Sequence, residues 1–301
     1  MSKTPAKTKE WTGTTGGSRF GQKALLFLFH FYNVSIGYIV LASVVPFYML
    51  FARKGYLAIY QYFRHRQGYG KIKAFCKTYQ NHFVFGQCML DRFAIYAGRR
   101  NFFKVEITGN EHFLRLLDDE KGFVAASSHT GNFELGGYLL SQDKKRIYGM
   151  VFGDEAKELM NRRIAALGLN NIFTVPVVDD MSHIFTLNEA LQKGDVVSMP
   201  CDRNFGSVKT VECDFLNGKA DFPQGAFALA VMFDVPVIAI FVMKVSFSKY
   251  RVYVRPLSTE NCEHLNKKAK ISRLAQSFAC ELEDIMRQYP EQWFNFYNFW
   301  K

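Results

Sequence analysis

The spacing of hydrophobic and polar positions changes near residue 105, after which short apolar runs alternate with stretches of helical periodicity. These apolar runs are strand-like in length and composition, and alternating strands and helices are typical of an α/β fold. We therefore predict a mixed central sheet flanked by helices. Five runs predict buried or extended strands, and two more alternate as half-exposed strands do: FVAASS (123–128), RIYGMVF (146–152), NIFTVPV (171–177), DVVSMPC (195–201), VPVIAIFVMK (235–244), TVECDF (210–215) and RVYVRPL (251–257).

The segments between these runs predict helices that cover the sheet. One opens at Leu135–Leu140, and others are predicted over Glu155–Leu167, Ser182–Gln192 and Gln224–Phe233. A stripe of apolar residues at i, i+3, i+4 and i+7 predicts a long amphipathic helix that ends near Tyr289–Pro290. That stripe comprises Ile271, Leu274, Ala275, Phe278, Leu282, Ile285 and Met286.

The first third of the chain has a different pattern. Residues 1–23 form a polar tail, and residues 24–51 form an apolar run without Asp, Glu, Lys or Arg, long enough to cross a bilayer. The run could span a membrane, lie in its interface, or pack as a buried helical hairpin with a break near Pro46. Residues 52–104 are basic and aromatic, and predict two helices separated near Gly68–Gly70. We thus expect a membrane-associating helical region at 24–104 and a catalytic α/β domain at 105–301.

Composition narrows the possible partners. A formal net charge of +11 favours an anionic partner, and no nucleic-acid-binding module is recognisable, which favours an anionic membrane surface or an acidic protein. Aromatic residues make up 16% of the chain, which suits apolar ligands or a lipid interface, although an unusually aromatic core would give the same value. The six cysteines form no CxxC pair and no zinc-like cluster, so we expect reduced thiols, a cytoplasmic setting and no metal site.

Candidate chemistry is concentrated in HTGNFE (129–134). The chain has no GxSxG elbow, no P-loop and no GxGxxG turn. His129 directly follows a predicted buried strand, and ligand sites of α/β sheets gather at the carboxyl ends of strands. A neutral imidazole can take a proton from a hydroxyl if an acceptor orients its other nitrogen, and Glu134 could fold back to do so. Alternatively, His129 is a structural loop residue and Glu134 a first-turn carboxylate favoured by the helix dipole.

Four features together resemble the lysophospholipid acyltransferase superfamily, especially its lipid A late-acyltransferase branch, the lauroyl and myristoyl transferases. The first two are the apolar and basic N-terminal region and the HX4E motif, His129 to Glu134, after a strand. The others are GDVVSMPCDRNFGS (194–207) and the ending YPEQWFNFYNFWK (289–301). The resemblance covers most of residues 20–301. It implies transfer of a fatty acyl chain from acyl carrier protein (acyl-ACP) or coenzyme A to a lipid hydroxyl, at the cytoplasmic face of the bacterial inner membrane.

The resemblance also implies roles for particular residues. His129 would be the general base and Glu134 its orienting partner, with no metal and no cofactor. Asn132, Arg162, Arg163, Asp202 and Arg203 match positions near the donor or acceptor. Pro223 and Gly225, in FPQG, resemble a block that holds an acceptor phosphate, since a helix start leaves backbone N–H groups free for an anion. For the two helical arginines and for FPQG, a solvated helix face and an ordinary helix entry are the simpler interpretations.

One departure bears on the acceptor. The lipid A branch tends to end in a His-Arg-Arg-Trp-like cluster, whereas residues 294–300 here read FNFYNFW, without Arg or His. An aminolipid, a lysophospholipid or a polyene-type lipid therefore stands beside a lipid A-type acceptor. Two other functions remain open at this point: an acyl thioesterase that uses the same pair to activate water, and a non-catalytic lipid-binding protein.

Overall fold

A computed structural model describes residues 34–136, 144–152, 170–177, 182–203, 209–257 and 264–300. The polar tail, the helix predicted over Glu155–Leu167, and Arg162 and Arg163 within it lie outside the described residues. The helix predicted to open at Leu135 is described only as far as Gly136.

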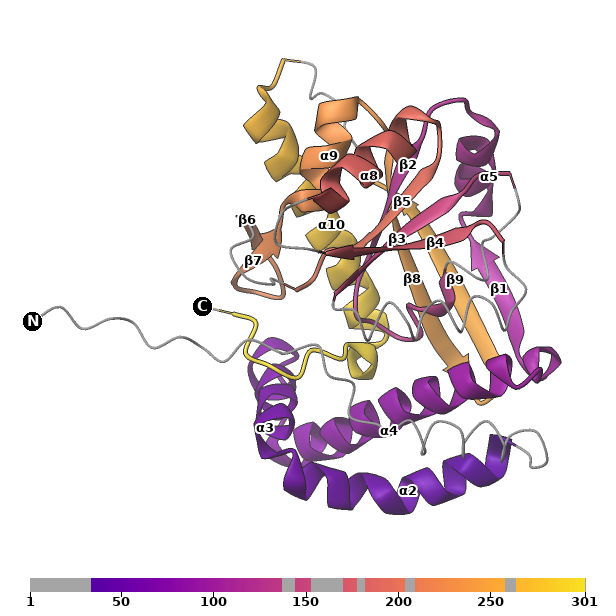
Figure 1. Ribbon diagram of the computed structural model, residues 1–301. Coiled ribbons are helices and arrows are strands. Elements are labelled where there is room, and N and C mark those ends of the chain that lie inside the picture. Colours follow the sequence, from indigo (N-terminus) through magenta and orange to yellow (C-terminus); the bar gives the residue numbers. More distant parts are fainter. Residues whose placement is uncertain are drawn as a thin grey trace, which may run out of the picture.

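Within the described residues, a seven-stranded sheet forms the centre of the fold, in the order β1-β9-β8-β2-β5-β3-β4 (Figure 1). The strands from β8 to β4 are parallel to one another, while β9 is antiparallel to β8 and β1 is parallel to β9. The mixed sheet flanked by helices confirms the predicted fold class. The strand bounds are β1 Lys104–Thr108, β2 Phe123–Ser127, β3 Ile147–Phe152, β4 Ile172–Val177, β5 Val196–Pro200, β8 Val237–Ser246 and β9 Lys249–Pro256.

The strands predicted from apolar runs all occur, each within about two residues of its predicted bounds. The run at 210–215 is β6 (Thr210–Asp214), which pairs antiparallel with β7 (Lys219–Pro223) in a separate hairpin. Sequence patterns did not reveal β7 or β1. Both are only five residues long and their exposure does not alternate strictly, so neither gives a clear strand signal.

Helices cover both faces of the sheet, and alternate residues of β2 serve the two faces. Val124 and Ala126 belong to the core under α8 (Ser182–Gln192), α9 (Gly225–Phe233) and α10 (Lys267–Gln288). Phe123 and Ala125 belong to the core under α5 (Asn110–Asp118) and the end of α4 (Lys71–Tyr96). Because β2 is covered on both faces, its sequence is a continuous apolar run rather than an alternation of apolar and polar residues.

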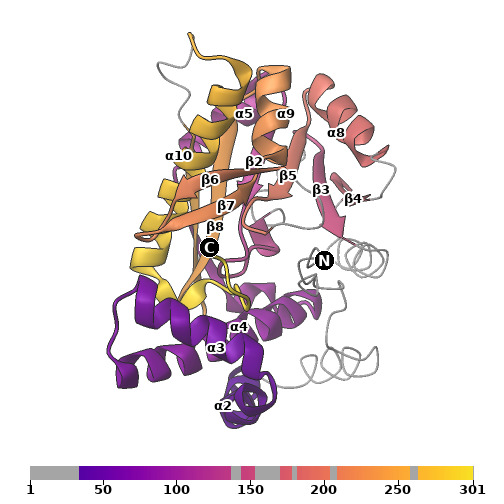
Figure 2. The ribbon, with the colours of Figure 1, turned by 90° about the vertical axis from the view of Figure 1, so that its left-hand side faces the viewer.

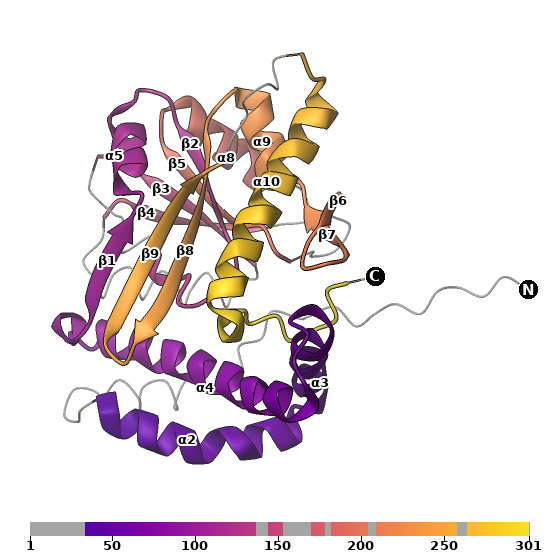
Figure 3. The same ribbon diagram turned by 180° about the vertical axis from the view of Figure 1, so that it is seen from behind.

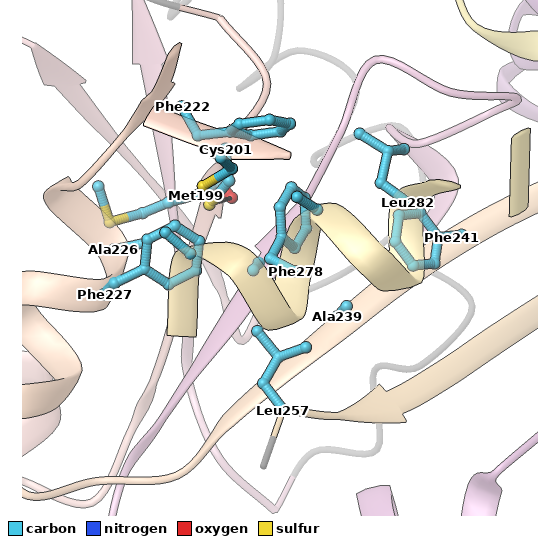
Figure 4. Packing of buried hydrophobic residues seen from close by; sticks show 14 of the residues in the cluster. Met199, Cys201, Phe222, Ala226, Phe227, Ala239, Phe241, Leu257, Phe278 and Leu282 are labelled. Carbon is cyan, nitrogen blue, oxygen red and sulfur yellow. Dashed lines mark hydrogen bonds between the residues drawn. The ribbon is translucent and has the colours of Figure 1, made fainter. Parts of the chain in front are cut away.

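The core under α10 is built largely from aromatic rings. Figure 4 shows Phe278 of α10 between Phe227 of α9 and Phe241 of β8. The ring centroids are 5.9 Å apart for Phe227–Phe278 and 6.1 Å apart for Phe241–Phe278. Much of the unusual aromatic content therefore lies in this core, as the simpler interpretation of the composition proposed.

Among the described residues, three helices precede the sheet and lie together at one end of the molecule (Figures 1 and 3). These are α2 (Val34–Phe51), α3 (Arg53–Gln61), which continues into the π-helical turn η1 (Tyr62–Arg66), and α4. The predicted separation near Gly68–Gly70 is confirmed, because α4 begins at Lys71. A 3-10 turn, η2 (Arg100–Phe102), leads into β1.

The helical break considered near Pro46 is absent, because α2 runs continuously through this residue. Proline has no N–H and cannot donate to the carbonyl four residues earlier, that of Ala42. The hydroxyl of Tyr79 in α4 donates to this carbonyl instead, at 3.1 Å. The neighbouring helix therefore satisfies the acceptor that the proline leaves unpaired, and α2 stays intact.

Candidate active site

The central strands bring His129 and Asp202 together. β2 and β5 are parallel neighbours in which Ser127 pairs with Pro200, and the backbone N–H of Cys201 still donates to Ser127 O beyond the strand ends, at 2.8 Å. His129 and Asp202 each lie two residues beyond this pair. Because His129 and Asp202 follow paired strand residues by the same number of positions, both lie at the same carboxyl edge of the sheet.

The Asp202 carboxylate holds the His129 ring. Oδ1 of Asp202 lies 2.7 Å from Nδ1 of His129, and Oδ2 accepts the backbone N–H of the same histidine at 2.8 Å. An ionised carboxylate can only accept, so the ring proton resides on Nδ1 and the lone pair on Nε2. The His129 side chain is 14% exposed, whereas Asp202 is fully buried. The arrangement is a buried carboxylate that fixes both the orientation and the tautomer of a partly accessible imidazole.

The C-terminal segment completes the surroundings of Asp202. After the 3-10 turn η3 (Pro290–Gln292), the indole N–H of Trp293 donates to Asp202 Oδ2 at 3.1 Å. The same segment pairs with the histidine loop through a β-bridge between Thr130 and Trp293, and Phe294 N donates to His129 O at 2.9 Å. The ending that carries the family resemblance thus holds the histidine loop in place.

Burial and charge set the protonation states of the pair. Burial lowers the pKa of His129 below its ordinary 6.5, against the opposing effect of Asp202. Burial alone would raise the pKa of the Asp202 carboxyl, but His129 and Arg203 hold it below the usual 3.8. At neutral pH the site therefore contains a neutral imidazole beside an ionised carboxylate, the pairing that a general base requires.

Glu134 has a different partner from the one its spacing predicts. Its carboxylate forms an ion pair with Arg92 of α4, and the oriented ring nitrogen, Nδ1 of His129, lies against Asp202. Among the described contacts, Asp202 is therefore the carboxylate that orients the histidine ring, and the pairing of His129 with Glu134 stays a prediction. The parallel register delivers Asp202 to the ring, whereas residues 132–134 turn toward α4. The Glu134 charge still raises the pKa of His129, though less than the Asp202 charge does.

Asn132 holds the motif to its scaffold. Its Oδ1 accepts from Arg92 Nε at 2.6 Å, and its Nδ2 donates to the hydroxyl of Tyr250 in β9 at 3.1 Å. Its backbone N–H donates to Val242 O of β8 at 2.7 Å. The side chain is fully buried. These contacts fix the position of the Asn132 side chain, and the substrate contact that the resemblance implied stays a prediction.

Gly131 permits the tight turn between His129 and Asn132. Its φ is +49°, in the left-handed region that glycine adopts at low cost. A Cβ at this position would lie 2.1 Å from Val242 O, so the turn also packs too closely on β8 for any side chain.

A cluster of buried polar groups lies behind Asn132. The Asp91 carboxylate of α4 accepts from Lys244 Nζ of β8 at 2.6 Å and from the hydroxyls of Tyr250 and Tyr38. Lys244 Nζ also lies 2.9 Å from the Tyr38 hydroxyl. Two consecutive residues of α4 therefore have different partners. Asp91 contacts side chains of the sheet and of α2, and Arg92 contacts side chains of the HTGNFE motif.

A cavity of about 150 Å³ opens beside the motif on the face of the sheet that carries α5. Its lining is mainly apolar, and Phe133 and Glu134 of the motif contribute to it. The Phe133 ring also lies against the His129 ring, with centroids 4.8 Å apart. The other lining residues are Phe113, Ala125, Ser127, Gly136, Ile147, Gly149, Met150, Val151, Ile172, Phe173, Thr174, Val196, Ser198, Pro200 and Ile240.

Comparison with known proteins identifies the family. Residues 75–301 match the family model described as bacterial lipid A biosynthesis acyltransferase. The chain belongs to this family. It is thus a lipid A-type acyltransferase in general terms, and the resemblance inferred from its motifs is confirmed. Among curated proteins, no sequence matches it.

Of the other residues expected at the acyltransferase site, some lie near the His129–Asp202 pair and some do not contact it. Arg203 is next to Asp202 and donates to Phe294 O at 2.8 Å, so it contacts the C-terminal segment. Pro223 and Gly225 lie at the junction of β7 and α9, where Gly225 faces Met199 of β5. Among the described contacts, neither forms a hydrogen bond with His129 or Asp202. Arg162 and Arg163, as stated above, lie outside the described residues.

Sequence reasoning missed Arg92 and Trp293 as members of this candidate site. Arg92 lies in CMLDRFAIY (88–96), where two adjacent charges interrupt an otherwise apolar helical stretch. Charges in such a setting are rarely buried without partners, and this could have indicated a buried polar cluster. Trp293 was recognised only as part of the ending, since nothing local predicts the direction of its indole N–H.

Proposed function

We propose that this protein moves a fatty acyl chain from an acyl thioester, on acyl carrier protein or coenzyme A, to a hydroxyl group of a lipid A-type lipid at the cytoplasmic face of the bacterial inner membrane. The observation that carries the proposal is the His129–Asp202 pair at the carboxyl edge of the sheet. The pair offers an oriented base, and no serine or cysteine nucleophile accompanies it in the described hydrogen bonds of His129. Such a base suits an external hydroxyl nucleophile.

The reaction follows from the free lone pair on His129 Nε2. The acceptor hydroxyl gives its proton to Nε2 while its oxygen attacks the thioester carbonyl. The tetrahedral intermediate then collapses, the carbon–sulfur bond breaks, and the imidazolium returns the proton to the leaving thiolate. Asp202 holds the ring and stabilises the imidazolium that forms, so its role is electrostatic and orienting. Glu134, held by Arg92, adds negative potential beside the ring and forms part of the cavity wall.

The cavity beside Phe133 supports an acyl-chain site. It is lined mostly by apolar side chains, as a hydrocarbon ligand requires, and it reaches the motif at Phe133 and Glu134. A chain lying there would have its thioester carbonyl near the histidine, because Phe133 contacts the His129 ring. The apolar lining favours a fatty acyl chain over a polar donor group.

The helical region supports association with a membrane. By length and composition α2 could cross a bilayer, and only 22% of its residues are buried. A core helix of a soluble protein passes the same test of length and composition, but most of its residues would be buried. The exposed apolar surface of α2 is therefore the part of the described fold best suited to lipid contact.

The test is a turnover assay with labelled acyl-ACP and acyl-coenzyme A, each with and without a lipid A-type acceptor. We expect acylated lipid to form from one donor and little free fatty acid to appear without acceptor. Release of fatty acid at the same rate with and without acceptor would assign the pair to thioester hydrolysis instead. No turnover of either thioester, with any of the aminolipid, lysophospholipid or lipid A-type acceptors, would contradict the proposal and favour a lipid-binding role.

A further inference from the structure

The α2 helix has two dissimilar faces. Val34, Tyr38, Val45 and Met49 are buried at spacings of four, seven and four residues. The opposite face is apolar as well, yet it is open: Ile39, Val40, Phe47, Leu50 and Phe51 are between 57% and 87% exposed. Scattered exposed apolar residues need no explanation, but a continuous apolar face marks an interaction surface.

Both ends of α2 are attached to the same α/β domain. Near its start, the Tyr38 hydroxyl donates to Asp91, and the Tyr38 ring packs on Phe247 with centroids 4.6 Å apart. After its end, α3 and η1 bury Ile59 and Phe63 in the core beneath α10.

The middle of α2 is also held, along α4. A Cβ at Gly86 of α4 would lie 2.5 Å from Leu41 Cδ1, which shows how closely the two helices approach. Figures 1 and 3 show α2 running beside α4 for most of its length, and Figure 2 shows it on the side of α4 away from the sheet. A helix of 18 residues is about 27 Å long, close to the thickness of the hydrocarbon core of a bilayer, so its ends would lie near opposite headgroup layers if it crossed. With both ends fixed to one domain, α2 cannot cross without breaking these contacts.

Charge around the exposed face indicates what covers it. No Asp or Glu occurs between Glu10 and Asp91. Exposed bases gather at the C-terminal end of the apolar face, with Arg53 and Lys54 at the start of α3 and Lys71 and Lys73 at the start of α4. Beside the latter pair, Ile72 is 82% exposed. An apolar face with exposed bases beside it complements an anionic lipid surface.

We propose that α2 lies in the plane of one leaflet of an anionic bilayer, with its open face among the acyl chains and the bases at its C-terminal end among the headgroups. This orientation deepens the membrane association in the proposed function and rests on it. With α2 in this orientation, the α/β domain lies on one side of the membrane, and α4 lies between α2 and the sheet.

The orientation can be measured by depth-dependent fluorescence quenching on the full-length protein. Single cysteines at Ile36, Val44 and Phe51 are labelled with bimane, after Cys76, Cys262 and Cys280 are replaced with Ser. The protein is bound to vesicles of phosphatidylcholine and phosphatidylglycerol that carry nitroxides at defined acyl-chain depths. Lys121→Cys, in the loop between α5 and β2, is the control that should remain unquenched.

The proposal expects the same shallow depth at all three positions, about 5–10 Å below the headgroups. A profile deepest at Val44, with shallow ends, would show a membrane span and overturn it. Lack of quenching at all three positions would also overturn it, as would a dimer that protects these thiols when no lipid is present. The readout needs no substrate, so an inactive protein with a flat depth profile would contradict the proposed reaction and leave this orientation intact.

A pair of matched variants tests the charge. Lys71→Gln with Lys73→Gln should weaken binding to anionic vesicles about thirtyfold, since two bases leave the headgroup layer. Lys267→Gln with Lys268→Gln removes two exposed bases at the start of α10, far along the chain from α2, and should leave binding unchanged. Equal losses in the two pairs would show a general charge effect and contradict the predicted orientation, as would equal binding of wild type to uncharged vesicles.

Discussion

The two ends of the HTGNFE motif are held by different parts of the molecule. At the first end, His129 lies at the sheet edge, where Asp202 and Trp293 determine its orientation. At the other end, Asn132 and Glu134 are held by Arg92 of the helical layer. The motif looks like one catalytic unit in the sequence, but the structure divides it into a chemical end and an anchoring end. A motif spacing therefore identifies which residues gather, and only the fold shows which carboxylate serves the histidine.

The largest effect should come from the chemical end. His129→Gln keeps a polar side chain of similar size but removes the base, so we expect acyl transfer to fall about 10⁴-fold, the upper end for a general base. The measurement is single-turnover transfer from labelled acyl thioester, with the thermal unfolding midpoint as a check on folding. A well-folded variant that retains a tenth or more of the activity would contradict the role of His129.

The anchoring end should instead respond in stability. Lys244→Met leaves the fully buried Asp91 without its charged partner, and breaking such a pair by removing one member costs about 3–5 kcal/mol. Urea unfolding monitored by circular dichroism measures the loss. Lys244→Met combined with Asp91→Leu is the control, and it should recover part of the stability because no buried charge is left unpaired. A single variant as stable as wild type would show that the pair contributes nothing to this layer.

Trp293 allows a finer test of the sheet edge. Trp293→Phe keeps an aromatic ring in the core but removes the N–H that donates to Asp202. A hydrogen bond to a charged group is worth about 1.5–3 kcal/mol, part of which water can replace, so we expect kcat to fall about tenfold. Phe299→Leu, which alters the same aromatic core without a hydrogen bond, is the matched control in the same assay. If both variants lose activity equally, packing rather than the hydrogen bond explains the effect.

The pH profile should show the smallest change. Burial lowers the pKa of His129 below 6.5, and the neutral ring is the active form. Activity should therefore persist as pH falls to 6.5 and decline only at lower pH, where the ring becomes protonated. The measurement is kcat between pH 4.5 and 8 at saturating donor. An acid limb centred above 6.5 would contradict the predicted direction of the shift.

Much of the architecture follows from local patterns, because buried parallel strands give continuous apolar runs and helices give a 3.6-residue period. The bounds of α8 were predicted to the residue from Ser182 at its start and the glycine after its end. The strand β1 was missed, because it is only five residues long and mostly exposed, and its exposure does not alternate strictly.

The site was only partly predictable, for a different physical reason. His129 could be found because it follows a recognisable strand. Its partner Asp202 lies 73 residues further along the chain, and it reaches the ring through the parallel register of β2 and β5, which no local pattern encodes. Glu134 was the expected partner because it is close in sequence, but its backbone turns toward Arg92, which lies in a helix 42 residues earlier.

The most direct test of this account compares Asp202→Asn with Glu134→Gln, each a replacement of a carboxylate by an amide. The measurement is the single-turnover rate of acyl transfer from thioester to lipid, taken over the acid limb of the pH–rate profile. We predict a loss of about 10²–10³-fold for Asp202→Asn, because the amide can no longer hold the reactive tautomer, together with a shift of the limb to lower pH. Glu134→Gln should lose less and shift the limb less. A Glu134→Gln variant as impaired as His129→Gln, beside an Asp202→Asn variant with wild-type activity, would contradict the account.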